Sequence, residues 1–208
     1  MNYTEIKALA LSYADRKDDE VSQNIDNFMR MVEARANRFL KTGDMSVRTI
    51  LSMNEDQSYF TLPSDFNGLR DIQVKDTGNA IGGCTLKYMS PEQMNNRANA
   101  PVNSNSQIYY TLLADQIQVF PTQPNGSLLE IVYYRRIIPL TSIAPINWVS
   151  EIHPDCYNNG LMVEISAFVK DKEATSLWDM RFQASLDAIQ TDDADSRWSG
   201  TALQTRVG

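Results

Sequence analysis

The chain has 208 residues, 42% of them hydrophobic, and a formal net charge of −7. This length and composition favour one domain, or one domain with an insertion, built around a hydrophobic core. The acidic balance argues against a protein that binds nucleic acid by neutralising phosphates, because such binding needs clustered Lys and Arg. A basic cluster of Arg35, Arg38 and Lys41 falls in the last turns of a predicted helix, where compensation of the helix dipole is the simpler interpretation.

The cysteines and the hydropathy pattern limit the cellular setting. Cys84 and Cys156 are the only cysteines, far apart and in no metal-ligand spacing, which indicates a reduced protein folded inside a cell. Residues 1–5 lack the basic stretch and apolar core of a targeting signal, and no apolar run approaches membrane-spanning length. We therefore expect a soluble protein with no membrane partner.

The first 44 residues predict two amphipathic helices. Thr4 is a candidate N-cap for a short helix, and a charged turn over residues 15–20 separates it from a longer one. The longer helix carries apolar residues at three- and four-residue spacing: Val21, Ile25, Phe28, Met29, Val32, Ala36, Phe39 and Leu40. Gly43 is expected to end this helix in a left-handed conformation.

From residue 45 to about residue 148 the pattern becomes that of strands. Short β-branched or aromatic runs predict strands over residues 47–51, 58–62, 69–74, 85–89, 107–112, 116–120 and 127–136. Residues 90–98 predict one or two helical turns opened by Pro91, and an Asn-rich loop follows. Short strands linked by hairpin turns favour an antiparallel sandwich or a small barrel.

Residues 152–189 predict a helical hairpin. Pro154 suits the first helical position, because the N–H that proline lacks would be unpaired there. One apolar stripe runs from Tyr157 to Val169, and Asp171 can cap a second helix whose stripe ends at Ile189. The two stripes leave apolar surface uncovered, so we expect the hairpin to pack on the N-terminal helices.

Together these elements predict an α+β fold, with a helical bundle built from both chain ends, an inserted antiparallel β-sandwich or barrel domain, and a C-terminal extended arm. The expected divisions are an N-terminal helical pair (1–44), the inserted β-domain (45–150), the C-terminal helical hairpin that packs with residues 1–44 (151–190), and the arm (191–208).

The sequence assembles no recognisable catalytic or metal-binding pattern. His153 is the only histidine and already serves as a helix start, which disfavours a His-centred triad. Cys/His metal sites are excluded by count, and Gly82-Gly83 lacks the pattern of a phosphate-binding loop. The acidic run at residues 191–195 lacks the Gly and Glu of a calcium loop. We therefore predict that the chain is not an enzyme and has no catalytic residue, metal or cofactor.

Two alternative functions stay open. A β-sandwich module could recognise carbohydrate through Trp148 or Tyr133-Tyr134, although each lies where core or strand is predicted. A hydrolase could use paired carboxylates, because such pairs are set by distance in the fold and not by spacing in the sequence. That hypothesis requires two carboxylates in one cleft, with at least one pKa raised.

The C-terminal segment carries a large aromatic and a few apolar residues but no helical stripe. A frayed terminus and a docking arm that folds onto a partner surface both fit this pattern. We favour the arm, with Trp198 and Leu203 as anchors. Its proposed partner-binding residues are Arg197, Trp198, Ser199, Gly200, Thr201, Ala202, Leu203 and Arg206.

This layout resembles the head-to-tail adaptor, or connector, proteins of tailed bacteriophages, especially short-tailed ones. The likeness covers nearly the whole chain, and its specificity lies in the order and spacing of motifs that are each weak alone. These motifs are Leu62-Pro63-Ser64-Asp65-Phe66, Ile117-Gln118-Val119-Phe120-Pro121, Leu129-Glu130-Ile131-Val132-Tyr133-Tyr134 with Pro139-Leu140, and Ile152-His153-Pro154-Asp155-Cys156-Tyr157 leading to Gly160-Leu161.

The resemblance implies a structural virion protein of the head–tail junction, assembled in the host cytoplasm as a homo-oligomeric ring of about twelve copies. It implies binding to the portal protein through the arm, and attachment of tail nozzle proteins and possibly tail-fibre proteins. Genomic DNA would pass through the channel without specific binding, which an acidic wall favours.

Overall fold

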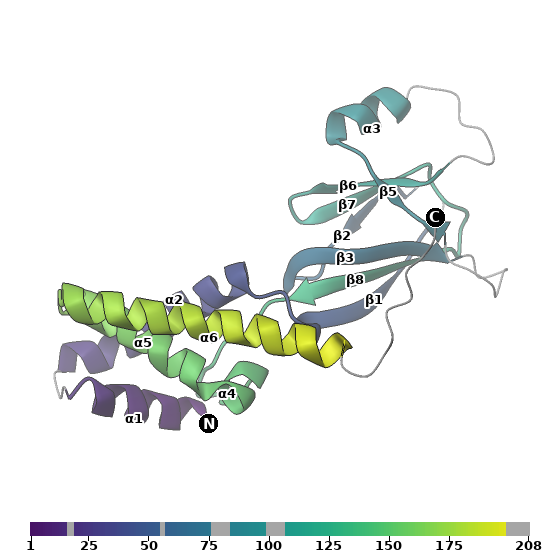
Figure 1. The fold of residues 1–208 in the computed structure, drawn as a ribbon. Helices are drawn as coiled ribbons and strands as arrows, with labels where there is room; N and C mark the ends of the chain where they lie inside the picture. Colours follow the sequence, from purple (N-terminus) through teal and green to yellow (C-terminus); the bar gives the residue numbers. More distant parts are fainter. Residues whose placement is uncertain (16–18, 55–56, 76–83, 99–106, 199–208) are drawn as a thin grey trace. The chain divides into compact units, whose positions relative to one another are not determined.

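The computed structural model describes residues 1–15, 19–54, 57–75, 84–98 and 107–198. The chain folds into two compact units (Figure 1). Residues 1–44 and those from Ile137 onward belong to a helical unit, and Met45–Arg136 form a β unit. The insertion therefore ends at Arg136, earlier than the expected boundary at residue 150.

The helical unit is built from both ends of the chain. Its helices are α1 (Tyr3–Tyr13), α2 (Asp19–Phe39), α4 (Trp148–Ile152), α5 (Pro154–Phe168) and α6 (Lys172–Trp198), and a short 3-10 turn, η1 (Gly43–Met45), follows α2. The long second helix and the C-terminal hairpin are confirmed. Gly43 has no positive φ and opens η1, so the predicted left-handed cap at this residue is wrong.

Local side-chain chemistry fixes where these helices begin. The Asn2 side chain accepts a hydrogen bond from the Glu5 backbone N–H at 2.9 Å, and the Glu5 carboxylate accepts one from the Asn2 N–H at 2.9 Å. This capping box begins α1, so the predicted cap at Thr4 is wrong. Pro154 begins α5, and Asp171 accepts from the Ala174 N–H at 3.0 Å to cap α6, both as predicted.

The central helix of this unit is α5, which packs against α1, α2, α4 and α6 (Figure 1). Gly160 marks the point of closest approach. A Cβ built there would lie 2.6 Å from Val32 Cγ1 and 3.1 Å from the Phe182 ring, so the site has room only for glycine. Helices from opposite ends of the chain therefore meet on one face of α5.

A short helix that the sequence analysis missed precedes α5. Asn147 caps α4: its side chain accepts from the Ser150 N–H at 2.9 Å, and the Ser150 hydroxyl accepts from the Asn147 N–H at 3.0 Å. This reciprocal pair satisfies two N–H groups that a helix start leaves free, which stabilises even one turn. Trp148 therefore lies on a helix and not at the end of a strand.

The helix α6 continues to Trp198, well beyond the predicted end near Ile189. Residues 191–198 are helical and do not begin an extended arm, which corrects the expected arm boundary at residue 191. The acidic run is compatible with a helix because Arg197 lies one turn after Asp193 and forms an ion pair with it at 2.6 Å.

The β unit contains β1 (Ser46–Ser52), β2 (Tyr59–Thr61), β3 (Phe66–Lys75), β4 (Cys84–Thr85), β5 (Lys87–Tyr88), helix α3 (Pro91–Ala98), β6 (Tyr109–Leu113), β7 (Gln116–Phe120) and β8 (Leu128–Arg135). The strands form two four-stranded sheets, ordered β1-β8-β3-β4 and β2-β7-β6-β5. The described strands close no barrel, so that form of the expectation is wrong.

Strand pairing departs from the predicted pattern at two places. The strand expected over residues 85–89 is split into β4 and β5, and β5 pairs with β6 in parallel whereas the other pairs are antiparallel. Gly68 lies inside β3 at a shift in register against β8. Its φ of 153° suits glycine and lets the strand continue through the irregularity.

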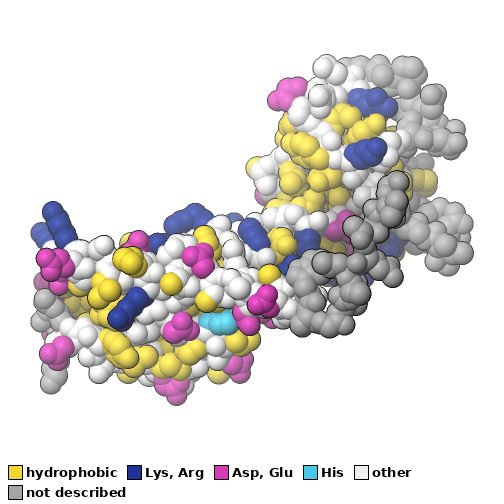
Figure 2. All heavy atoms as spheres, in the orientation of Figure 1, with side chains coloured by type: hydrophobic (Ala, Val, Ile, Leu, Met, Phe, Trp, Pro, Cys, Tyr) yellow, Lys and Arg dark blue, Asp and Glu magenta, His cyan; other side chains and the backbone are white. Residues whose placement is uncertain are grey.

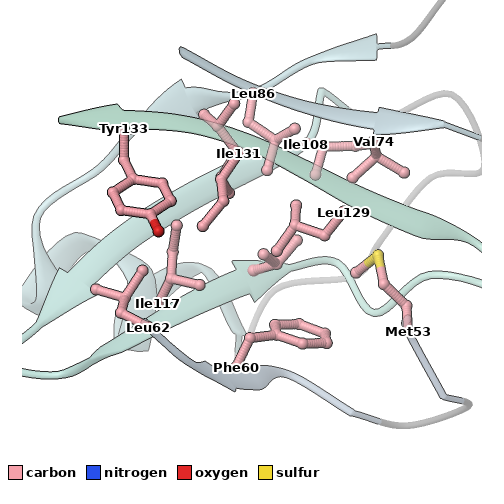
Figure 3. Packing of buried hydrophobic residues seen from close by; sticks show 12 residues of the cluster. Met53, Phe60, Leu62, Val74, Leu86, Ile108, Ile117, Leu129, Ile131 and Tyr133 are labelled. Atoms are coloured by element: carbon pink, nitrogen blue, oxygen red, sulfur yellow. The ribbon is translucent and has the colours of Figure 1, made fainter. Parts of the chain in front are cut away.

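One hydrophobic cluster fills the β unit and draws residues from both sheets (Figure 3). Ile117 and Val119 of β7 and Leu129 and Ile131 of β8 are fully buried at alternate positions along their strands. Further members come from other strands and the loops between them: Met53, Phe60, Leu62, Ile72, Val74, Leu86, Ile108 and Tyr133.

Candidate assembly surface

The first two of the eight predicted docking residues fall within the described structure. Arg197 and Trp198 form the last turn of α6. The rest of that set, Ser199, Gly200, Thr201, Ala202, Leu203 and Arg206, lies outside the described residues, as does the Trp198 side chain.

The end of α6 is fastened to the end of α2. The Gly43 N–H donates to Asp193 Oδ1 at 2.6 Å, and Asp193 Oδ2 pairs with Arg197. Gln190 donates from Nε2 to the Phe39 carbonyl at 2.8 Å, which satisfies a carbonyl that lies past the last intrahelical bonds of α2. The C-terminal part of α6 is therefore fixed to the end of α2 and the turn after it.

The outer side of α6 carries exposed apolar side chains in the first half of the helix. Met180 is 70% exposed and Leu177 is 49% exposed, and the small residues Ala184 and Ala188 continue the same side. Figure 2 shows hydrophobic side chains lying between the charged ones on the helical unit. Since the opposite side of α6 carries the buried Phe182, this helix has two apolar sides.

A buried polar network joins α2, α5 and the segment before α4. Glu33 is 5% exposed, and its Oε1 accepts from the Leu140 N–H at 2.7 Å and from the Tyr157 hydroxyl at 2.9 Å. Asn147 donates from Nδ2 to the Tyr157 oxygen at 2.7 Å and to the Ile138 carbonyl at 2.7 Å. The network holds the chain at its return from the β unit in one position on the helices.

The ionisable groups of this network have shifted pKa values. Burial raises the pKa of Glu33, and the hydrogen bonds from Leu140 and Tyr157 oppose that shift. Burial and the nearby Glu33 raise the pKa of Tyr157, so its hydroxyl stays protonated and remains a donor. Burial also raises the pKa of Cys156 to about 12, which keeps this thiol unreactive.

The structure does not gather the aromatic residues considered for carbohydrate binding. Tyr133 is 3% exposed, stacks on Phe66 with ring centroids 5.7 Å apart, and donates its hydroxyl to Asp65 at 2.9 Å. A side chain held in this way has no free ring face for a sugar. Trp148 belongs to the helical unit and packs edge-on against His153, so it does not share a sheet with Tyr134.

Two carboxylates that a paired-carboxylate hydrolase could use have structural partners. Asp171 caps α6, and Asp65 accepts from Tyr133. Burial and the nearby Asp179 raise the pKa of Glu164, and Arg35 opposes that shift. Asp179 itself forms an ion pair with Arg35 at 2.5 Å.

An open hollow of about 480 Å³ lies at the turn between α5 and α6. Asp179 lines it together with Ala167, Lys170, Asp171, Lys172, Thr175 and Ser176, and Glu164 is not among the lining residues. No group of His, Cys, Asp or Glu with the spacing of a metal site occurs in the described ranges. Among the helices that the structure describes, none is long and apolar enough to cross a membrane.

Two features of α6 were not predicted from the sequence: the contacts that hold its C-terminal end and the exposed apolar stripe on its outer side. Asp193 and Arg197 are separated by one helical turn, a spacing that supports a helix through the acidic run. Leu177, Met180, Ala184 and Ala188 recur at three- and four-residue intervals, which is a second stripe beside the one that was recognised.

Comparison with known proteins agrees with the resemblance seen in the motifs. A family model described as SU10 adaptor protein matches residues 1–206. A search of curated proteins gives no match. The chain therefore belongs to the SU10 adaptor protein family, a family of structural phage adaptor proteins and not of enzymes.

Proposed function

We propose that this adaptor forms the ring between the portal and the tail of a phage particle, at the head–tail junction, and is assembled in the host cytoplasm. The observation that carries the ring is the apolar outer side of α6, with Met180 70% exposed. A stripe of this kind is uncommon on a protein that works as a monomer and is typical of an interface. About twelve copies would close the ring by head-to-tail contacts.

We assign portal docking to the C-terminal arm. The end of α6 is anchored by the Gly43–Asp193 and Phe39–Gln190 hydrogen bonds, so the arm has a fixed origin on the helical unit. A segment with a fixed origin loses less freedom when its remaining residues bind a partner. The arm in this proposal begins at Arg197, and residues 199–208 carry most of the contact.

We assign the attachment of nozzle proteins and fibre proteins to the β unit. Its hydrophobic cluster is complete within the unit, and exposed Tyr59 and Tyr88 offer aromatic contact to tail components. The formal net charge of −7 suits a conduit wall, because an acidic surface repels DNA and lets the genome pass without specific binding.

Co-sedimentation with the cognate portal ring tests portal docking. The informative variant ends after Trp198, which removes residues 199–208 and leaves the Gly43–Asp193 hydrogen bond and the Asp193–Arg197 ion pair in place. The full chain should co-sediment and the shortened chain should not, while both keep the same helical circular dichroism. A scrambled order of residues 199–208 in a full-length chain is the matched control and should also fail. Equal binding of all three chains would contradict docking through the arm.

A further inference from the structure

The outer side of α6 combines small residues with acidic ones. Asp187 and Asp195 are exposed and lie eight residues apart, with Ala188 and Thr191 between them, also exposed. Eight residues correspond to about 12 Å along a helix. This part of α6 is therefore a shallow strip with a negative charge at each end.

The outer side of α2 is the complement of this strip. Arg30 and Arg38 are exposed and also lie eight residues apart, and between them stand the exposed Met31 and Ala34. Met31 is 52% exposed, although it is a large apolar residue in the middle of the helix. The strip on α2 therefore has a positive charge at each end and a protruding side chain between them.

Both strips lie on the sides of their helices that are turned away from the core. The buried residues of α2 include Ile25, Met29, Val32 and Ala36, and those of α6 include Phe182, Leu186 and Ile189. Arg35, whose side chain points toward α6 and pairs with Asp179, is not part of the α2 strip. The two strips of one copy therefore face away from its own core, where other copies can contact them.

We propose that the α6 strip of one copy binds the α2 strip of the next copy in the ring. This inference rests on the proposed ring and names the two surfaces that build it. Equal spacing lets Arg30 and Arg38 face the two aspartates, while Met31 fits over Ala188 and Thr191 as a large residue over small ones. Because the two strips differ, the contact is head-to-tail and repeats around a closed ring.

Charge complementarity indicates that the partner of the α6 strip is a second copy of this chain. The α6 strip is acidic and would repel DNA, and it lacks the basic residues that an anionic partner would require. The same chain carries a basic strip of matching spacing, so one gene product supplies both sides of the contact.

Reversing the charges tests this pairing with an internal rescue. One variant carries Arg30→Glu and Arg38→Glu, and the other carries Asp187→Arg and Asp195→Arg. Each alone places like charges against each other in every contact, so the affinity between copies should fall about tenfold or more. An equimolar mixture should assemble again, because each variant then meets the opposite charge on its neighbour. Sedimentation velocity with and without the portal ring measures the assemblies.

Arg30→Glu adds a negative charge near Asp26 and Glu33 and can impair folding. A steric variant therefore tests the same contact without changing charge. Ala188→Trp fills the shallow strip on an exposed helix position and should abolish assembly without changing the melting temperature. Ala8→Trp, at an exposed position of α1, is the matched control and should assemble normally.

The outcomes separate this inference from the function on which it rests. If the wild-type chain forms no ring with or without the portal, the proposed function fails and the inference fails with it. If the wild-type chain forms rings and both charge-reversed variants form them equally well, the ring stands and the α2–α6 pairing is overturned. Loss in each variant with recovery in the mixture supports the pairing.

Discussion

The two units of this adaptor bury different chemistry. In the helical unit, Glu33, Asn147 and Ser150 are buried among apolar residues and are hydrogen-bonded. Glu33 accepts hydrogen bonds from residues far away in the sequence, and Asn147 and Ser150 bond to each other. The β unit is filled by one cluster of apolar side chains that includes Tyr133. Its other buried polar residues, Thr111, Gln118, Ser127 and Glu130, are outside that cluster, and Glu130 pairs with Lys75 and Arg48.

This difference affects how precisely each unit fixes the positions of its packed side chains. A hydrophobic cluster tolerates small shifts, because burial depends on area and not on direction. Buried hydrogen bonds and a glycine-only contact fix distance and angle, and an error there leaves polar groups unpaired. We infer that the helical unit is held in the more exact arrangement, which agrees with the proposed contact between its helices in neighbouring copies.

The largest expected effect is at the glycine-only contact. Gly160→Leu would drive a side chain into Val32 and Phe182 and should lower the free energy of unfolding by about 3 kcal/mol. Urea denaturation followed by circular dichroism measures the change. Ala8→Leu, at an exposed position of α1, is the control and should change stability little. An unchanged midpoint for Gly160→Leu would contradict close packing at α5.

The next effect compares one hydroxyl in each unit. Tyr157→Phe removes a donor to Glu33 and an acceptor for Asn147 inside the helical unit, and should lower stability by about 2 kcal/mol. Tyr133→Phe removes only a bond to Asp65, which is partly exposed, and should lower it by about 0.5 kcal/mol. Equal losses in urea denaturation would remove the contrast between the two units.

A pH series isolates the buried carboxyl. The pKa of Glu33 is raised in the folded state, so the folded chain keeps this proton at pH values where the unfolded chain has released it. The stability that Glu33 contributes is therefore full below its ordinary pKa of 4.5 and is lost as the pH rises through the raised value. Relative to Glu33→Gln, the wild-type chain should gain stability as the pH falls from neutral. Parallel pH profiles would argue against a raised pKa.

The smallest effect is local, at the end of α6. Asp193→Ala removes the contacts to Gly43 and Arg197 and should destabilise the last turns by about 1 kcal/mol. Hydrogen exchange at residues 191–198 should become about fivefold faster, while exchange in α5 stays the same. Asp192→Ala, an exposed neighbour, serves as control. Equal exchange rates in the two variants would show that Asp193 does not hold the helix end.

Local signals predicted much of the fold. The Pro154 helix start and the Asp171 cap depend on neighbouring residues, and both are confirmed. The strand over β7 follows from its β-branched and aromatic residues between turn signals, and the long helix α2 follows from the periodicity that one buried face imposes. Asn147 and Ser150 also form a local signal for α4, but a single turn has too little periodicity to stand out beside the strands before it.

Other features depend on contacts between distant parts of the chain. Parallel pairing of β5 with β6 and the length of α6 are set by partners far away in the sequence, such as Gly43 for Asp193. Glu33 lies within the apolar stripe of α2, four residues after Met29 and three before Ala36, and that position could have flagged it as buried. Of the predicted docking residues, only Arg197 and the backbone of Trp198 fall within the described part of the chain.

Cross-linking on the portal ring tests most directly whether the helical unit joins the copies. The chain would carry Cys84→Ser, since Cys84 is exposed and Cys156 is buried, with Ala34→Cys and Ala188→Cys added. A short bis-maleimide should then give a ladder of linked chains that ends at the closed ring, and either added cysteine alone should give no ladder. A ladder formed instead by a chain with exposed Ser52→Cys and Thr61→Cys on the β unit, with none from the α2 and α6 pair, would contradict the account.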